Sequence, residues 1–237
     1  MQQARRNFLQ GLGALTFGGA ASAADQAMAA PAPAPGGGAH RWAMAVDLSK
    51  CIGCQACTVS CIHENAVPEG SFRTIVSTYE VSDGNSAAMV MLPRLCNHCA
   101  DAPCIPVCPV GATWQQADGI VVVDSNRCVG CAYCVQACPY DARFINHETN
   151  KADKCTFCNH RVQAGLLPAC VESCVGGARI FGDLNDPSSM VSKIAANSEA
   201  KVLKPELKTG PHVFYLGLDD AMTGKVEGEP TLWRPNA

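Results

Sequence analysis

The spacing of the cysteines constrains this chain more than any other feature of its sequence. The sixteen cysteines fall into four groups of four, which begin at Cys51, Cys96, Cys128 and Cys155. The first and third groups have the spacing C-x2-C-x2-C-x3-C, the second has x4 as its middle gap, and the fourth has x11 there. Because a [4Fe–4S] cluster is held by four cysteine thiolates, four such groups are the ligand set for four clusters.

Two other uses of cysteine fit this spacing less well. An exported chain could form disulfides, but disulfides do not require cysteines two or three residues apart in every group. Structural zinc uses two short pairs separated by a longer gap, so a third cysteine beside a pair would be surplus. Cys108 and Cys138 are each followed by proline, which completes the bacterial cluster-binding signature or a close variant of it. The pattern therefore favours iron–sulfur clusters.

The last cysteine of each group is expected to bind the cluster of a different group. In two-cluster ferredoxins the fourth cysteine of a run ligates the other cluster, because the chain leaves the first one through a short helix. Groups two and three then exchange their last cysteines, and groups one and four do the same. The expected ligand sets are Cys51, Cys54, Cys57 and Cys174 (cluster 1), Cys61, Cys155, Cys158 and Cys170 (cluster 2), Cys96, Cys99, Cys104 and Cys138 (cluster 3), and Cys108, Cys128, Cys131 and Cys134 (cluster 4).

Residues 1–30 resemble a twin-arginine export signal. Arg5 and Arg6 precede a weakly apolar stretch rich in glycine and alanine, which is too short for a membrane span of about 20 residues. Cleavage after Ala23 or Ala29 would fit the A-x-A pattern. Clusters are assembled in the reducing cytoplasm, so a loaded protein must be exported folded, as the twin-arginine route allows. We therefore expect a periplasmic protein.

The rest of the chain lacks the patterns of several other functions. Its formal charge is −3 with no basic block, which argues against nucleic acid and anionic membrane surfaces as partners. No further segment is apolar enough to span a bilayer, so any quinone chemistry needs another, membrane-bound subunit. The sequence also has no nucleophile elbow and no phosphate loop, and we expect no catalytic residue in this chain.

The expected fold class is α+β, with two pseudo-symmetric ferredoxin-like halves that carry loop insertions and are fused in one compact domain over residues 41–220. Residues 31–40 form a Pro/Gly linker before it, and residues 221–237 form a C-terminal tail. The inner ferredoxin unit is expected at 93–148. The outer unit is expected to combine 41–70 with 150–185.

Apolar and β-branched runs predict the strands, and turn and cap residues predict the helices. Short helices are expected to begin near Gln55 and Ala132, after cysteine loops. A longer helix is expected from Asp186, as its N-cap, to Ala200. The expected strands are 42–47, 73–81, 87–92, 120–124, 143–146, 179–182 and 213–218.

A basic residue lies at or just before the start of each cysteine group. These residues are Lys50, Arg94, Arg127 and Lys154. They could bond to backbone or acidic groups at the surface. They could instead offset the negative charge of thiolate-bound clusters and so raise the reduction potentials. The sequence leaves both interpretations open.

The chain resembles the four-cluster iron–sulfur subunits of molybdopterin oxidoreductases of the dimethyl-sulfoxide-reductase class. Within that class it is most similar to the beta subunits of tetrathionate reductases. The resemblance extends from about 41 to 220. The segments that carry it are 51–61, 92–99, 128–147, 154–158, 165–174 and 211–220.

The resemblance implies an electron-transfer subunit without an active site of its own. Electrons would pass from an integral-membrane quinol-oxidising subunit, through four [4Fe–4S] clusters, to a molybdopterin catalytic subunit that reduces tetrathionate to thiosulfate. It implies that cluster 1 faces the molybdenum subunit and cluster 4 the membrane subunit. Sibling subunits share many of these segments, so the same role in a polysulfide, thiosulfate or other oxyanion enzyme stays open. A free periplasmic polyferredoxin shuttle is a further alternative.

Overall fold

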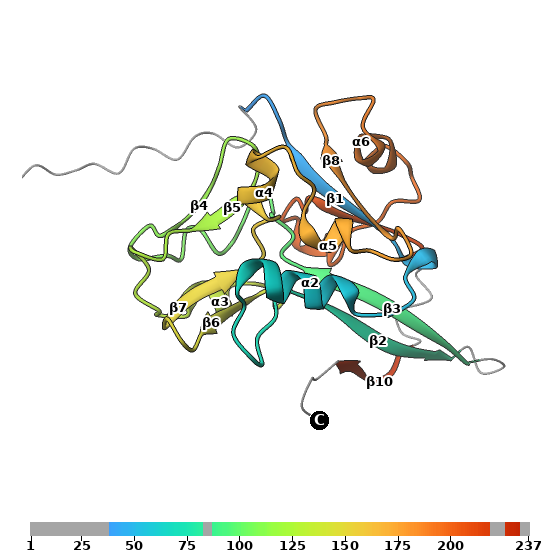
Figure 1. Cartoon of the computed structure of the whole chain (residues 1–237), viewed down its shortest axis with the longest axis horizontal. Coiled ribbons are helices and arrows are strands. Elements are labelled where there is room, and N and C mark those ends of the chain that lie inside the picture. The colour runs from blue at the N-terminus through green and yellow to red at the C-terminus, as the bar shows by residue number, and fades with distance from the viewer. Residues whose placement is uncertain (1–37, 83–86, 219–225, 233–237) are drawn as a thin grey trace, which may run out of the picture. The chain divides into compact units, whose positions relative to one another are not determined.

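The computed structural model describes residues 38–82, 87–218 and 226–232 (Figure 1). The expected export signal and nearly all of the expected linker lie outside them. The described elements combine helices and strands, as the α+β prediction requires. The helices are α2 (Ala56–Asn65), α3 (Tyr133–Gln136), α4 (Asn159–Gln163), α5 (Ala169–Glu172) and α6 (Met190–Ala195), with short 3-10 turns η1 (Leu48–Lys50) and η2 (Pro205–Leu207). The strands are β1 (Trp42–Asp47), β2 (Thr74–Ser82), β3 (Ala87–Leu95), β4 (Thr113–Gln115), β5 (Val121–Val123), β6 (Arg143–Asn146), β7 (Lys151–Lys154), β8 (Arg179–Asp183), β9 (Val213–Leu216) and β10 (Val226–Leu232).

An antiparallel strand pair joins each cysteine group to the next. The strand that follows one group pairs with the strand that precedes the next group: β2 with β3, β4 with β5, and β6 with β7. The series closes on itself, because β8 follows the fourth group and pairs with β1, which precedes the first. The fourfold repeat of the cysteines is thus matched by a repeat of strand pairs.

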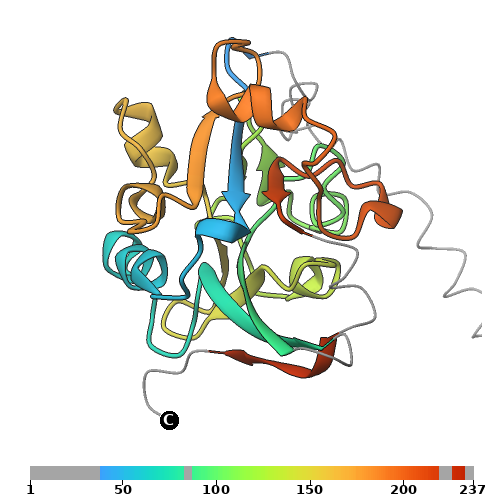
Figure 2. The same cartoon turned by 90° about the vertical axis from the view of Figure 1, so that its right-hand side faces the viewer.

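Two further strands extend these pairs into three-stranded sheets. Strand β9 lies parallel to β1 on the side away from β8. Strand β10 lies antiparallel to β2 along its outer edge, as both views show (Figures 1 and 2).

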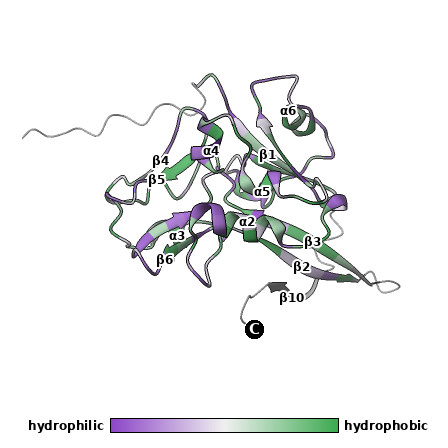
Figure 3. Ribbon diagram, viewed as in Figure 1, coloured by the Kyte–Doolittle hydropathy of each residue, from purple (hydrophilic) through white to green (hydrophobic). Residues whose placement is uncertain are grey.

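The strands differ in hydropathy: β5 is hydrophobic and β7 is hydrophilic (Figure 3). This contrast follows from their sequences, VVV and KADK.

A residue with left-handed backbone precedes three of the helices that follow cysteine loops. The N-caps of α2, α3 and α4 are Gln55, Ala132 and Cys158, with φ of 60°, 63° and 51°. This conformation is uncommon outside glycine, and here it turns the chain sharply from loop to helix. The predicted helix starts near Gln55 and Ala132 are confirmed. Helix α2 then packs against α5, which carries Cys170 of the fourth group.

The predicted helix from Asp186 to Ala200 is wrong in its bounds. Helix α6 spans only Met190–Ala195, and its N-cap is Ser189. The Asp186 carboxylate accepts hydrogen bonds from the backbone N–H and the hydroxyl of Ser188, at 2.8 and 2.7 Å. These bonds close a turn in place of a first helical turn, which is how Asp and Ser side chains compete with helix formation.

Most predicted strands are present, with small shifts at their ends. The bounds predicted for β1 and β6 match the structure, whereas β9 stops at Leu216 because Gly217 has a φ of 74°. The short strands β4 and β7 were not predicted. Each is the partner that completes a hairpin, with β5 and β6 respectively.

Cysteines make up much of the buried core. One apolar cluster contains Met44, Val46, Phe157 and Tyr215 together with buried cysteines of all groups but the third. A second cluster contains cysteines of the second and third groups around Ala112 and Val121. Most of the cysteines are therefore buried or half-buried, whereas Cys54 and Cys131 are exposed. No helix in the described part of the chain has the length and apolar character needed to cross a membrane.

Candidate metal centres

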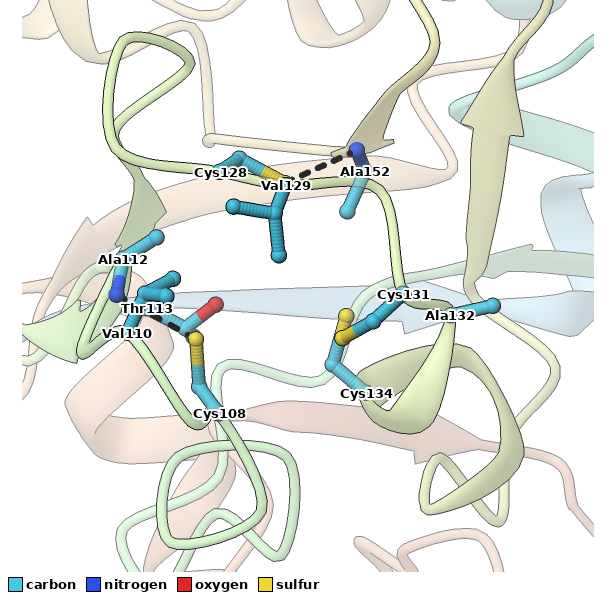
Figure 4. Close-up of a pocket in the computed structure, with 10 residues that line it drawn as sticks. All are labelled: Cys108, Val110, Ala112, Thr113, Cys128, Val129, Cys131, Ala132, Cys134 and Ala152. Carbon is cyan, nitrogen blue, oxygen red and sulfur yellow. Dashed lines mark hydrogen bonds between the residues drawn. The ribbon is translucent and has the colours of Figure 1, made fainter.

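Three cavities are each lined by four cysteines, and each draws them from two groups. The first is lined by Cys51, Cys54, Cys57 and Cys174. The second is lined by Cys61, Cys155, Cys158 and Cys170. The third is lined by Cys108, Cys128, Cys131 and Cys134 (Figure 4).

The remaining four cysteines also lie together. Cys99 and Cys104 belong to one buried cluster of side chains, which also contains Cys128 and Cys134, and both Cys108 and Cys138 pack against it. Burial raises the pKa of Cys99 to about 12, and the charges of Cys96, Cys104 and Cys138 act in the same direction. The structure therefore places Cys138 with the second group and Cys108 with the third. The three cavities bring together the cysteines of three expected sets, and ligation of a cluster by each of the four sets stays a prediction.

The sixteen thiols are free, and none is joined in a disulfide. Within the described residues, no three His, Cys, Asp or Glu side chains converge closely enough to hold a single metal ion. The cysteines instead stand around cavities. Four soft thiol donors around one space are a donor set that suits an iron–sulfur cluster.

Burial disfavours the charged form of several of these thiols. It raises the pKa of Cys61 to about 12 and that of Cys170 to about 11. In both cases the charges of neighbouring cysteines contribute, and nearby arginines act in the opposite direction. Bound metal must displace these protons, because the thiolate is the form that ligates metal.

Backbone N–H groups point at the sulfur atoms of the last cysteines. Ala112 N–H donates to Cys108 Sγ at 3.2 Å, and Ala178 N–H donates to Cys174 Sγ at the same distance. Figure 4 shows the first of these bonds, together with the bond from Ala152 N–H to Cys128. Burial opposes ionisation of Cys108, but four successive backbone N–H groups outweigh it and lower its pKa. Hydrogen bonds to sulfur are one means by which a protein tunes a cluster.

Two buried arginines sit at equivalent places beside the thiols. Arg143 begins β6, and its Nη2 donates to Cys104 Sγ at 3.0 Å. Arg179 begins β8, and its Nη1 lies 3.8 Å from Cys170 Sγ. Each guanidinium also donates to a threonine that begins another strand of the series: Arg143 to Thr113 and Arg179 to Thr74.

Sequence reasoning missed both arginines, although a signal for them exists. Each lies five residues after the last cysteine of its group, in the repeated pattern C-x4-R at 138–143 and 174–179. After the first and second groups, the residue that begins the following strand is a threonine, Thr74 or Thr113, instead of an arginine. The strand repeat therefore brings one arginine and one threonine together in each pair of groups.

The four basic residues that the sequence singled out divide into two kinds. Lys50 forms an exposed ion pair with Asp47, Arg94 donates to the Ser77 hydroxyl, and Arg127 is exposed. Lys154, in contrast, is buried, and its ammonium donates to the carbonyl oxygens of Val121 and Cys155. The surface interpretation fits the ion pair of Lys50, whereas Arg94 is half-buried and its partner Ser77 is buried. Lys154 alone lies deep among the cysteines.

Two protein-family models match the chain, and both are described as a 4Fe–4S dicluster domain. One matches residues 50–112 and the other residues 87–184. Together with the cysteine cavities, these matches define the class: the chain is an iron–sulfur protein of the kind that transfers electrons.

Full-length relatives define the family more closely. The chain is 59% identical to a tetrathionate reductase subunit of Salmonella typhimurium, over 99% of this chain and 97% of that protein. It is 37% identical to a selenate reductase subunit of Mesobacillus selenatarsenatis, over 74% and 72%, and 41% identical to protein NrfC of Escherichia coli, over 90% and 95%. The chain belongs to the family of iron–sulfur subunits that includes the one found in tetrathionate reductase.

Proposed function

We propose that this chain relays electrons through four [4Fe–4S] clusters to a molybdopterin catalytic subunit that reduces tetrathionate to thiosulfate. The observation that carries the proposal is the set of three cavities, each lined by four cysteines that come from two groups. The high identity to a tetrathionate reductase subunit along nearly the whole chain supports the choice of substrate. The electrons would come from an integral-membrane quinol-oxidising subunit.

The sixteen cysteines would hold the clusters in the four sets that the exchange of last cysteines predicts. A bound cluster supplies one-electron redox chemistry at iron. The chain's own groups then act on it: thiolates ligate the iron, backbone N–H groups bond to sulfur, and buried apolar residues exclude water. None of these steps requires an acid, a base or a nucleophile from the protein.

Two ferredoxin-like halves would each hold one pair of clusters. Groups two and three share Arg143 and Thr113, whereas groups one and four share Arg179 and Thr74. The repeated arginine–threonine contact supports a pseudo-twofold relation between an inner and an outer unit. Each exchange of last cysteines would hold the two clusters of one half close together, and short separations favour electron transfer.

The exposure of individual cysteines supports the order of the clusters along the path. Cys54 of cluster 1 and Cys131 of cluster 4 are exposed, and clusters 2 and 3 have no exposed cysteine. Exposed apolar side chains stand beside both: Ile52 and Val175 near cluster 1, and Val129 and Tyr133 near cluster 4. This exposure supports clusters 1 and 4 as the two ends of the path. From the family resemblance we infer that cluster 1 faces the molybdenum subunit and cluster 4 faces the membrane subunit.

The compartment is part of the same proposal. Residues 1–30 would direct export of the folded, cluster-loaded chain by the twin-arginine route, and the chain would stay at the periplasmic face of the membrane through its membrane partner. Fusion of residues 1–37 to a reporter that fluoresces only after cytoplasmic folding tests this. Periplasmic fluorescence lost in an Arg5→Lys, Arg6→Lys variant is the expected result.

Purification of the native complex tests the central proposal. We expect the chain to copurify with a molybdenum-containing subunit, to contain about 16 iron atoms as four clusters of four, and to show no reductase activity alone. The complex is then assayed on tetrathionate, thiosulfate, polysulfide, selenate and dimethyl sulfoxide. A chain that purifies alone as a monomer would favour a free electron shuttle instead.

The substrate panel matters because other relatives act in different enzymes. Subunits of a selenate reductase and of a putative dimethyl sulfoxide reductase are 37% and 40% identical to this chain. If the complex reduced one of those substrates and left tetrathionate unchanged, the electron-transfer role would stand and the tetrathionate assignment would be wrong.

A further inference from the structure

Three cations are buried among the cysteines that would hold the clusters. The exposed fractions of Arg143, Lys154 and Arg179 are 4%, 1% and 3%. Their side chains bond to thiols, hydroxyls and carbonyl oxygens. Because their charges are shielded from water, they act on neighbouring groups with little screening. The cysteine sets that lie beside each cation are therefore the ones on which its charge acts.

Arg179 lies between the first and second cysteine sets. It lines the cavity of Cys51, Cys54, Cys57 and Cys174, and its Nη1 is 3.8 Å from Cys170 Sγ of the second set. Burial acts against the charge of Arg179, but the thiolates of Cys170, Cys57 and Cys155 outweigh it and raise its pKa. Cys57 belongs to the first set, and Cys170 and Cys155 belong to the second. The charge of one guanidinium therefore acts on both sets.

Arg143 lies in the same way between the third and fourth sets. Its Nη2 donates to Cys104 Sγ of the third set at 3.0 Å. Its Nη1 donates to the Thr113 hydroxyl at 3.4 Å, and Thr113 lines the cavity of the fourth set.

Lys154 lies where the two halves meet, between the second and third sets. Its ammonium donates to the carbonyl of Cys155, a cysteine of the second set, at 2.7 Å. It also donates to the carbonyl of Val121, which lies in one apolar cluster with Cys99 and Cys104 of the third set. The Val121 N–H donates to Nδ1 of His98 at 3.0 Å. The ring of His98, from the loop of Cys96 and Cys99, stacks on Phe157, from the loop of Cys155 and Cys158, with centroids 3.8 Å apart.

We propose that one buried cation occupies each junction of the four-cluster path: Arg179 between clusters 1 and 2, Lys154 between clusters 2 and 3, and Arg143 between clusters 3 and 4. This inference rests on the proposed function, because it takes the four cysteine sets as four clusters. A reduced cluster carries one more negative charge than an oxidised one. Each cation therefore stabilises the reduced state of both neighbours and raises their reduction potentials.

A redox titration of the intact complex tests this assignment without a prior assignment of the four signals. The variants are Arg179→Gln, Lys154→Gln and Arg143→Gln, and the four midpoint potentials are followed by electron paramagnetic resonance. Arg179→Gln should lower two potentials and Arg143→Gln the other two. Lys154→Gln should lower one from each pair. We expect the electron-sharing equilibrium between a shifted and an unshifted cluster to change about tenfold, which corresponds to 59 mV for one electron.

Arg127→Gln is the matched control, because Arg127 immediately precedes Cys128 as Lys154 immediately precedes Cys155, yet Arg127 is exposed. It should leave all four potentials unchanged. The charge-retaining variants Arg143→Lys, Lys154→Arg and Arg179→Lys should keep them close to those of the unaltered protein. Glutamine variants with full iron and unshifted potentials would overturn the assignment, as would shifts that fall on clusters outside the assigned pair.

Iron content separates the remaining outcomes. If a glutamine variant loses iron while its charge-retaining counterpart keeps it, the charge is needed beside the clusters and the inference stands. If both lose iron, the residue acts through its shape and the inference fails. An unaltered protein with fewer than four [4Fe–4S] clusters would instead contradict the proposed function, and this is measured before any variant is made.

Discussion

At the scale of single residues, the buried His212 forms one hydrogen bond through its ring and another, through its backbone, to a cysteine loop. Its Nε2 accepts a hydrogen bond from Arg41 Nε at 2.9 Å, so the ring is held in its neutral form. Its backbone N–H donates to the carbonyl of Asn97, between Cys96 and Cys99. Burial lowers the pKa of His212 to about 4, and the charge of Arg41 adds to this effect.

This histidine predicts a loss of stability in mild acid. Its pKa is 6.5 when unfolded and about 4 when folded, so the unfolded chain binds more protons between these values. Stability is fully present above pH 6.5 and falls by up to about 3 kcal/mol as the pH approaches 4. Thermal unfolding of the loaded protein between pH 7 and pH 4 measures this. His212→Gln, which stays neutral, should show a smaller fall in Tm, and an identical fall would contradict the role given to His212.

At the scale of elements, the cysteine loops depend on close backbone packing. Gly130 lies between Val129 and Cys131 with a φ of 71°, and an added Cβ would stand 2.3 Å from the carbonyl oxygen of Asn150. Only glycine adopts this conformation without strain, and only a hydrogen fits the space. Gly130 thus fixes the loop of the third group against the turn between β6 and β7.

Gly130→Ala should therefore cost more than a left-handed alanine alone, which is about 1–2 kcal/mol. We expect a lower Tm and loss of the iron held by Cys128, Cys131 and Cys134. Gly70→Ala is the control, because Gly70 has a φ of 75° with nothing within 4 Å of the added Cβ. It should lower Tm slightly and keep all the iron. Iron per chain and thermal unfolding distinguish the two, and equal iron in both variants would show that the Asn150 contact is unimportant.

Elements also show what the sequence can and cannot predict. Strands β1 and β6 were predicted with correct bounds because each is a compact run that ends at a clear turn. Strands β4 and β7 were missed because three or four residues carry no periodicity, and their pairing with a neighbour defines them. The spacing of the cysteines identifies them as ligands from the sequence alone. The role of Arg143 and Arg179 is recognised only in the fold, which places them beside thiols.

At the scale of the whole molecule, the proposed exchange of last cysteines would connect distant parts of the chain. Cys174 and Cys51 line one cavity although 123 positions separate them (174 − 51). The strand series explains how: β8 after the fourth group pairs with β1 before the first. Cluster binding in one group therefore depends on the fold of another.

Substitution of Cys138 tests this dependence. Cys138 follows the loop of the third group, yet burial together with its charge raises the pKa of Cys99 and of Cys104 in the second. Cys138→Ala should therefore remove or convert the cluster of the second group and leave that of the third. Cys134→Ala, four residues earlier in the same group, should damage the third-group cluster instead. Electron paramagnetic resonance of the two variants compares them, and the same lost signal in both would refute the exchange.

The two ends of the path lead to a final prediction about the partners. Ile52 and Val129 occupy equivalent positions after Cys51 and Cys128, are 65% and 60% exposed, and lie beside the exposed thiols of clusters 1 and 4. A glutamate in a docking surface must be desolvated on binding, so it weakens association. Ile52→Glu should release the molybdenum subunit while quinol still reduces the clusters. Val129→Glu should block reduction by quinol while the molybdenum subunit stays bound. Met190→Glu, at the similarly exposed start of α6 (59%), should change neither. Copurification and cluster reduction in membranes measure both effects, and loss of the same partner in both variants would show that the two ends do not face different subunits.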